Sequence, residues 1–133
     1  MANEPVMPWQ QLIRDGRERG FLTKPLYAVF STPVNGLGPV LEALDEHAAF
    51  QVKLEQDGIM FVAGPFADDA EERWDGEGFF VYRASSREEA IQIAEEDPMH
   101  RSGARTFRVR PWLLNEGTFR THINYSTGRA EIL

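Results

Sequence analysis

Four short segments of the chain have the hydrophobic pattern of β-strands. Three of them are apolar on both faces and are bounded by Gly or Pro, which is typical of buried strands; they are residues 26–31, 59–66 and 78–84. A fourth strand is expected at residues 107–112, where apolar and polar side chains alternate. The tail after Asn115 alternates more weakly, and this predicts one more strand there.

Helical periodicity follows the first strand. Pro39 suits the first turn of a helix and Gly58 is typical of the residue just past a helix end, which predicts a helix at residues 39–57. One face of this helix consists of Val40, Leu44, His47, Ala48, Gln51 and Leu54. His47 and Gln51, one turn apart, therefore lie within a face that is expected to be buried.

A second helix is predicted at residues 86–97, between the third and fourth strands. Ser86 and Glu89 have the spacing of a capping box, which marks a helix start. The helix is expected to end at Asp97, because the residue before a proline is disfavoured in the α conformation. Asp97 then caps a short turn from Pro98 to Ser102, orients a histidine, or does both.

The order of these elements predicts the fold class. Two strand–helix–strand units with right-handed crossovers form an α+β, ferredoxin-like βαββαβ fold, with an antiparallel sheet and both helices on one face. The strands place apolar side chains on both faces, namely Tyr27, Val29, Phe30, Phe61, Val62, Phe79 and Phe80. A second subunit would shield the uncovered face, so we expect a homodimer. Residues 1–25 are expected to form an N-terminal extension with a short helix at residues 9–19.

Composition limits the partners and the compartment. Of the 133 residues, 42% are hydrophobic and 26% are charged, as in ordinary globular proteins. The formal net charge of −7 disfavours binding to nucleic acid or to an anionic membrane. The chain has no cysteine, which excludes disulfides and thiolate catalysis, and its N-terminus lacks the features of a secretory signal. We expect a soluble, cytoplasmic protein.

His47 is the first candidate for chemistry. It is either a packed core histidine, hydrogen-bonded to the backbone or to Gln51, or a general acid–base residue in a pocket between helix and sheet. A second polar cluster consists of His100, Arg101 and Arg105. Its arginines either bind a carboxylate or phenolate of a small-molecule ligand or offset the acidic surface. The spacing of these residues matches no metal-ligand pattern, and a Gly-rich phosphate loop is missing, so we expect no metal and no cofactor.

Several short motifs, taken in order, resemble the YCII-related family. They are His47 in the first helix, Ala63-Gly64-Pro65 at the end of the second strand, Asp97-Pro98, and Arg108-Val109-Arg110-Pro111-Trp112 in the fourth strand. The resemblance covers residues 26–117 and leaves residues 118–133 as a C-terminal tail. Met99 stands where the family often has Phe, which is expected to alter the pocket wall.

The resemblance implies a dimeric α+β barrel and a histidine–aspartate pair formed by His47 and Asp97. A related characterised member removes chloride from a chlorinated hydroxyquinol, and the fold is similar to that of muconolactone isomerase. We therefore predict a cofactor-independent lyase or isomerase for a small aromatic or lactone-like substrate; the alternatives are a non-catalytic ligand-binding module and a purely structural dimer. His47 is the predicted base and Asp97 its orienting partner. The predicted substrate-binding residues are His100, Arg101, Gln51, Gly64 and Trp112.

Overall fold

The computed structural model describes residues 3–133 and divides the chain into two units. One unit is Pro25–Trp112, and the other combines the segments before and after it. Met1 and Ala2, at the start of the predicted N-terminal extension, lie outside the described residues. All residues predicted to carry chemistry belong to the Pro25–Trp112 unit.

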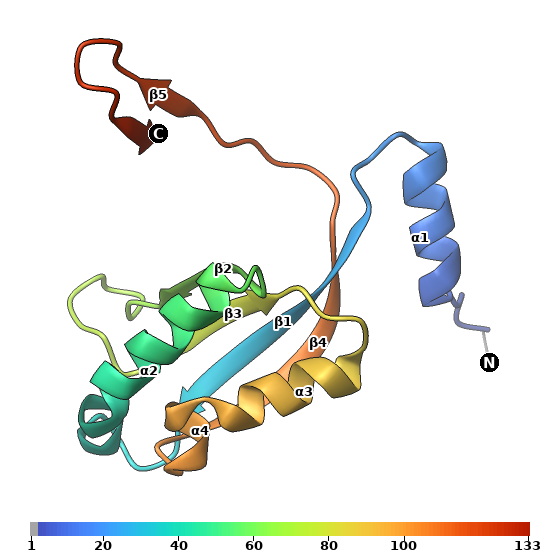
Figure 1. The fold of residues 1–133 in the computed structure, drawn as a ribbon. Coiled ribbons are helices and arrows are strands. Elements are labelled where there is room, and N and C mark those ends of the chain that lie inside the picture. Colours follow the sequence, from blue (N-terminus) through green and yellow to red (C-terminus); the bar gives the residue numbers. More distant parts are fainter. Residues whose placement is uncertain (1–2) are drawn as a thin grey trace. The chain divides into compact units, whose positions relative to one another are not determined.

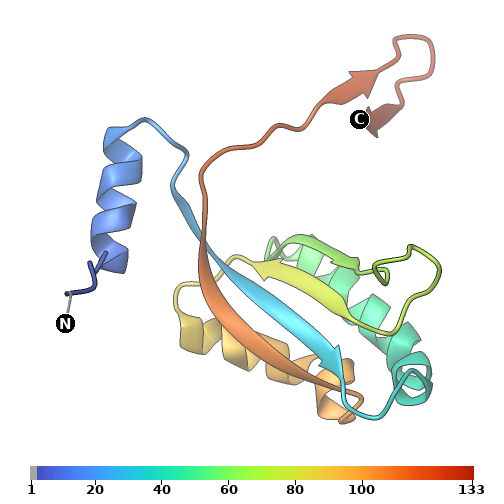
Figure 2. The same ribbon diagram turned by 180° about the vertical axis from the view of Figure 1, so that it is seen from behind.

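This larger unit has the predicted α+β, ferredoxin-like architecture, with a four-stranded antiparallel sheet of order β2-β3-β1-β4. Figure 1 shows the helices of this unit on one side of the sheet, and Figure 2 shows the opposite side, which carries none of them. The elements are β1 (Lys24–Pro33), α2 (Gly38–Gln56), β2 (Met60–Pro65), β3 (Gly78–Tyr82), α3 (Arg87–Glu96), α4 (Pro98–Arg101) and β4 (Arg105–Leu114). The predicted fold class is therefore confirmed.

Strand register decides which side chains face the helices. In the antiparallel pair of β1 and β3, Val29 lies opposite Phe80 and Phe30 lies opposite Phe79. Because successive side chains point to opposite faces, Val29 and Phe80 join the core beneath the helices, whereas Phe30 and Phe79 lie on the other face. The core cluster consists of Val29, Leu54, Met60, Phe80, Tyr82, Ala90, Ala94 and Val109.

Local signals set the helix ends. The Ser86 side chain accepts a hydrogen bond from the backbone N–H of Glu89 at 3.1 Å, as the capping-box spacing predicts. Gly58, with φ +75°, follows the end of α2, where an L side chain would be strained. The buried side of α2 differs from the predicted face at two positions. Ala43 is buried, whereas Ala48 is exposed because that part of the helix borders a cavity rather than the core.

The smaller unit contains α1 (Trp9–Glu18) and a short hairpin of β5 (Thr121–Ile123) and β6 (Ala130–Ile132). In α1, Ile13 is buried, whereas Trp9 and Leu12 are exposed. The tail thus contains two short strands that pair with each other, where one strand was predicted. Among the described residues, no helix has the length and apolar character needed to cross a membrane.

Candidate functional site

A buried histidine–aspartate pair joins α2 to the end of α3. His47 Nδ1 lies 2.7 Å from Asp97 Oδ1; His47 is 6% exposed and Asp97 is fully buried. A carboxylate only accepts hydrogen bonds, so Nδ1 carries the proton and donates it to Asp97. The other ring nitrogen, Nε2, then has a free lone pair, and no described residue donates to it. The two residues are 50 positions apart, so only the tertiary fold brings them together.

Asp97 is held in place by the backbone at the α3–α4 junction. It is extended at φ −61° and ψ 127°, ends α3, and is the N-cap of α4, which begins at Pro98. Its Oδ1 also accepts the backbone N–H of Met99 at 2.9 Å. Both predicted roles of Asp97, cap and histidine partner, are thus combined in one carboxylate oxygen. Oδ2 is buried and has no partner among the described residues.

A tyrosine lies in the core near this pair. The Tyr82 hydroxyl is buried and makes no hydrogen bond to any described residue. Burial, and secondly the negative charge of Asp97, raise its pKa above the ordinary value of tyrosine. Tyr82 therefore stays a neutral hydroxyl.

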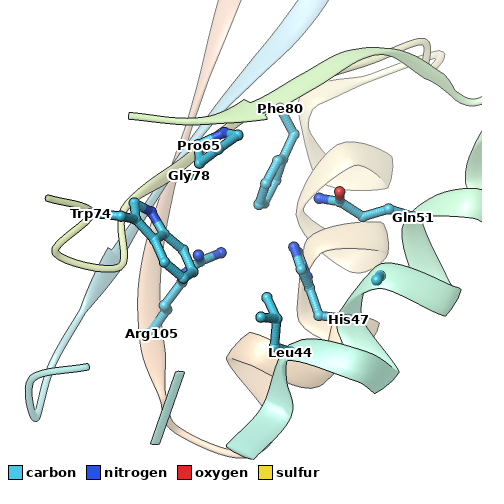
Figure 3. Close-up of a pocket in the computed structure, with 10 residues that line it drawn as sticks. Leu44, His47, Gln51, Pro65, Trp74, Gly78, Phe80 and Arg105 are labelled. Atoms are coloured by element: carbon cyan, nitrogen blue, oxygen red, sulfur yellow. The ribbon is translucent and has the colours of Figure 1, made fainter. Parts of the chain in front are cut away.

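The histidine borders a cavity of about 320 Å³ between α2 and the ends of β2 and β3. Figure 3 shows the side chains of His47, Gln51 and Arg105 reaching toward one space among mostly apolar walls. The lining residues are Leu44, His47, Ala48, Gln51, Gly64, Pro65, Trp74, Gly78, Phe80 and Arg105. The centres of the Phe80 and His47 rings lie 5.4 Å apart, so the two rings pack against each other. This combination of apolar walls and a few converging polar groups is typical of small-molecule sites.

Gln51 supplies a second polar group on the α2 side of the cavity. Its Nε2 is buried and makes no hydrogen bond to any described residue. Unsatisfied buried donors are uncommon in folded proteins, and at a cavity wall such a donor is available to a ligand. Gln51 makes no hydrogen bond to His47. The hydrogen-bond partner of His47 is Asp97, not Gln51 as in one of the two alternatives considered for a packed histidine.

Comparison with known proteins identifies the family. The model of the YCII-related domain matches residues 26–113. The chain belongs to the YCII-related family. A solved structure with the same fold is 5-chloro-2-hydroxyhydroquinone dehydrochlorinase (TftG) from Burkholderia phenoliruptrix AC1100, in complex with 2,5-dihydroxybenzoquinone. It is 22% identical, covers 65% of this chain and 92% of its own, and has a TM-score of 0.53. No curated protein sequence matches the chain.

In this YCII-related domain, the predicted binding residues do not all meet at the cavity. Gln51 and Gly64 line it together with His47. Arg101 is exposed and Trp112 is 38% exposed, and neither belongs to the cavity wall. Met99, expected to alter that wall, instead fills a fully buried cluster with Val40, Ala43 and Ala104.

His100 lies beside the site, but both of its ring nitrogens are hydrogen-bonded to other protein groups. Its Nδ1 donates to the backbone carbonyl of Ala94 at 2.6 Å, and its Nε2 accepts from the Ser31 hydroxyl at 2.7 Å. This arrangement requires a neutral ring, and burial lowers the pKa of His100. His100 does not line the cavity. Among residues 3–133, no three His, Asp or Glu side chains gather in a way that would hold a metal ion.

Among the cavity residues that were not predicted as site residues, Arg105 and Trp74 carry polar N–H groups. Arg105 belongs to the charged cluster whose arginines were expected either to bind a carboxylate or phenolate or to offset the acidic surface, but it was not chosen as a site residue. It shares the strand face of Phe107 and Val109, and this parity places it toward the helices. Trp74 belongs to an acidic loop, and its indole Nε1 donates to the carbonyl of Glu77 at 2.8 Å. No sequence signal identifies Trp74, because only the folded loop brings it to the cavity.

Proposed function

We propose that this protein is a cofactor-independent enzyme that moves a proton on a small organic molecule, with His47 as the general base. The single observation that supports this most is the 2.7 Å contact between His47 Nδ1 and the buried Asp97 carboxylate. It fixes the tautomer in which Nε2 accepts a proton, and it stabilises the imidazolium that forms. A histidine that served only packing would not need a buried carboxylate at this distance.

The reaction that fits these groups is a lyase or isomerase step. His47 Nε2 takes a proton from a carbon next to a carbonyl or enol, and the electrons of the C–H bond form a new C=C bond. In a lyase, a leaving group on the adjacent carbon departs with its bonding electrons. In an isomerase, the π electrons of the carbonyl move onto its oxygen to give an enolate, and the proton held by His47 then returns at another carbon of the conjugated system. The apolar walls keep water away from the intermediate, which strengthens the electrostatic interactions within the cavity.

The cavity volume supports a small substrate. About 320 Å³ lies at the lower end of the range for small-molecule pockets, roughly 300–1,000 Å³. The similarly folded dehydrochlorinase was solved with 2,5-dihydroxybenzoquinone, a compound with one ring. We therefore propose an aromatic or lactone-like substrate of one ring for this chain.

Turnover assays with hydroxyquinols and enol-lactones test the proposal. We expect His47→Ala to lower kcat by about 100-fold or more, since a positioned general base contributes roughly 10²–10⁴. His122→Ala is the matched control, because His122 is an exposed histidine in the tail. Turnover that survives His47→Ala contradicts the mechanism. Binding without turnover in the wild type supports the non-catalytic ligand-binding module instead.

We also propose that two copies associate through the sheet face that carries no helices. Phe30, Val62 and Phe66 on the outer side of the larger unit are 38%, 47% and 46% exposed, and the Phe30 and Phe79 rings lie 5.3 Å apart. Packing this face against a second copy would remove these apolar side chains from water. A cysteine-free chain fits the reducing cytoplasm, which is the compartment we propose for this homodimer.

A further inference from the structure

Arg105 brings a positive charge into the wall of the cavity. The residue is only 4% exposed, although arginine is rarely buried without a partner. Figure 3 shows it on the Trp74 side of the cavity, with His47 and Gln51 on the α2 side. Its guanidinium carbon lies 5.9 Å from the centre of the Trp74 ring, so the cation is stacked against one apolar wall.

Two hydrogen bonds fix the guanidinium and leave the rest of it available. Nε donates to the carbonyl of Gly76 at 2.8 Å, and Nη1 donates to Ser31 Oγ at 3.4 Å. Arginine has five N–H donors, so three remain without a partner among the described residues. Gly78 makes room for this head group, since a Cβ there would lie 3.1 Å from Arg105 Nη1.

The charge of Arg105 has no carboxylate partner. The ion pairs within the described residues are His47 with Asp97 and Arg73 with two aspartates, and none includes Arg105. Burial lowers the pKa of Arg105, because fewer waters solvate its charge; the more distant Asp97 offsets this only in part. A buried cation is costly unless an anion compensates it. An anion in the cavity would provide that compensation.

We propose that the cavity binds a small, one-ring anion, with its carboxylate or phenolate oxygen at Arg105 and its ring among Phe80, Trp74 and Pro65. Planar oxyanions match the guanidinium because several N–H groups can donate to them at once. This inference rests on the proposed function in one respect: the bound anion presents its ring carbons to His47. Arg105 then also offsets the additional negative charge that develops on the bound ring system when His47 removes a proton.

The test compares an anion with its neutral counterpart of nearly the same shape. Benzoate and benzamide are titrated into the full-length protein by calorimetry at pH 7.5. We expect benzoate to bind at least about 10-fold more tightly than benzamide in the wild type, which corresponds to about 1.4 kcal/mol. Arg105→Gln should abolish this preference. Lys53→Gln removes one positive charge from an exposed position on α2 and should keep it.

A second measurement does not depend on the folding of the Arg105→Gln variant. In the ¹⁵N-labelled wild type, benzoate but not benzamide should shift the side-chain Nε–H resonance of Arg105. Equal affinities for the two compounds, no benzoate binding at millimolar concentration, or loss of the preference in Arg101→Gln rather than in Arg105→Gln would each overturn the proposal. His47→Gln separates the two proposals: it should stop turnover but keep the preference for benzoate.

Discussion

Replacing Asp97 with Ala should strongly destabilise the protein, because one oxygen of this residue makes two structural contacts. Asp97 Oδ1 accepts the backbone N–H of Met99 at 2.9 Å and His47 Nδ1 at 2.7 Å. Alanine removes both acceptors. The first turn of α4 then loses its cap, and the His47 N–H is left within the protein without its partner.

The magnitude follows from these two contacts. Loss of an N-cap costs about 1 kcal/mol, and an unsatisfied buried donor costs about 1–3 kcal/mol. Part of this is recovered, because an alanine side chain buries no charge, whereas Asp97 buries a carboxylate whose Oδ2 has no partner among the described residues. We therefore expect the free energy of unfolding to fall by about 2–3 kcal/mol, a large share of the ~5–15 kcal/mol of a typical domain.

Urea unfolding at one fixed protein concentration and pH 7.5 measures this loss, and two matched variants divide it. Asp97→Ser keeps a good N-cap but is too short to replace the carboxylate at His47, so it should recover about 1 kcal/mol relative to Asp97→Ala. Asp97→Asn keeps an acceptor oxygen for both contacts and should lower turnover more than stability. A cost below about 0.5 kcal/mol for the alanine variant, or equal costs for the serine and alanine variants, would refute the reasoning.

Three further residues, His100, Phe30 and Gly76, give testable expectations. Burial lowers the pKa of His100 below 6.5, so the folded state binds fewer protons than the unfolded chain, and stability should fall as the pH drops below about 6.5. Urea unfolding of His100→Asn should show a smaller fall in stability with pH than the wild type. Equal dependence of stability on pH in the two proteins would contradict this. Phe30→Lys should reduce the light-scattering mass from twice 15.1 kDa to 15.1 kDa, whereas a wild-type monomer at tens of micromolar would disprove the dimer. Gly76→Ala places a Cβ 2.9 Å from the Pro33 side chain, at a residue with φ +100°, and should displace the Gly76 carbonyl that accepts a hydrogen bond from Arg105. The Tm of this variant should fall, and a benzoate titration should show weaker binding. An unchanged affinity for benzoate would show that Gly76 does not position Arg105.

Much of the fold could be predicted because its signals are local. The cap at Ser86, the break before Pro98 and the glycine at position 58 each act within one or two helical turns, and the structure places helix ends at these points. Strand ends were predicted less well. β1 begins at Lys24 and β4 continues to Leu114, since backbone pairing extends beyond the apolar runs that mark a strand in the sequence.

The site was only partly predictable, and the difference lies in the kind of signal. His47 and Gln51 were detectable because polar side chains on an apolar helix face contradict the hydrophobic pattern. Arg105 was considered for anion binding but was not chosen as a site residue, because a charged residue among other charged residues contradicts no pattern until its strand face is assigned. Trp74 depends on how a loop folds over the cavity, which no periodicity encodes.

The same junction shapes the chain and forms the site. Pro98 prevents α3 from continuing, so Asp97 adopts an extended backbone and its side chain turns back to cap α4. Met99, two residues later, packs fully buried against Val40 and Ala43 of α2 and so holds α4 against the helix that carries His47. The distance between the histidine and the carboxylate is therefore set by helix packing rather than by a flexible loop. Met99→Ala leaves the cavity wall unchanged, but it should still lower kcat in steady-state assays, because it loosens the contact between His47 and Asp97. An unchanged kcat would show that this contact does not depend on the packing of α4.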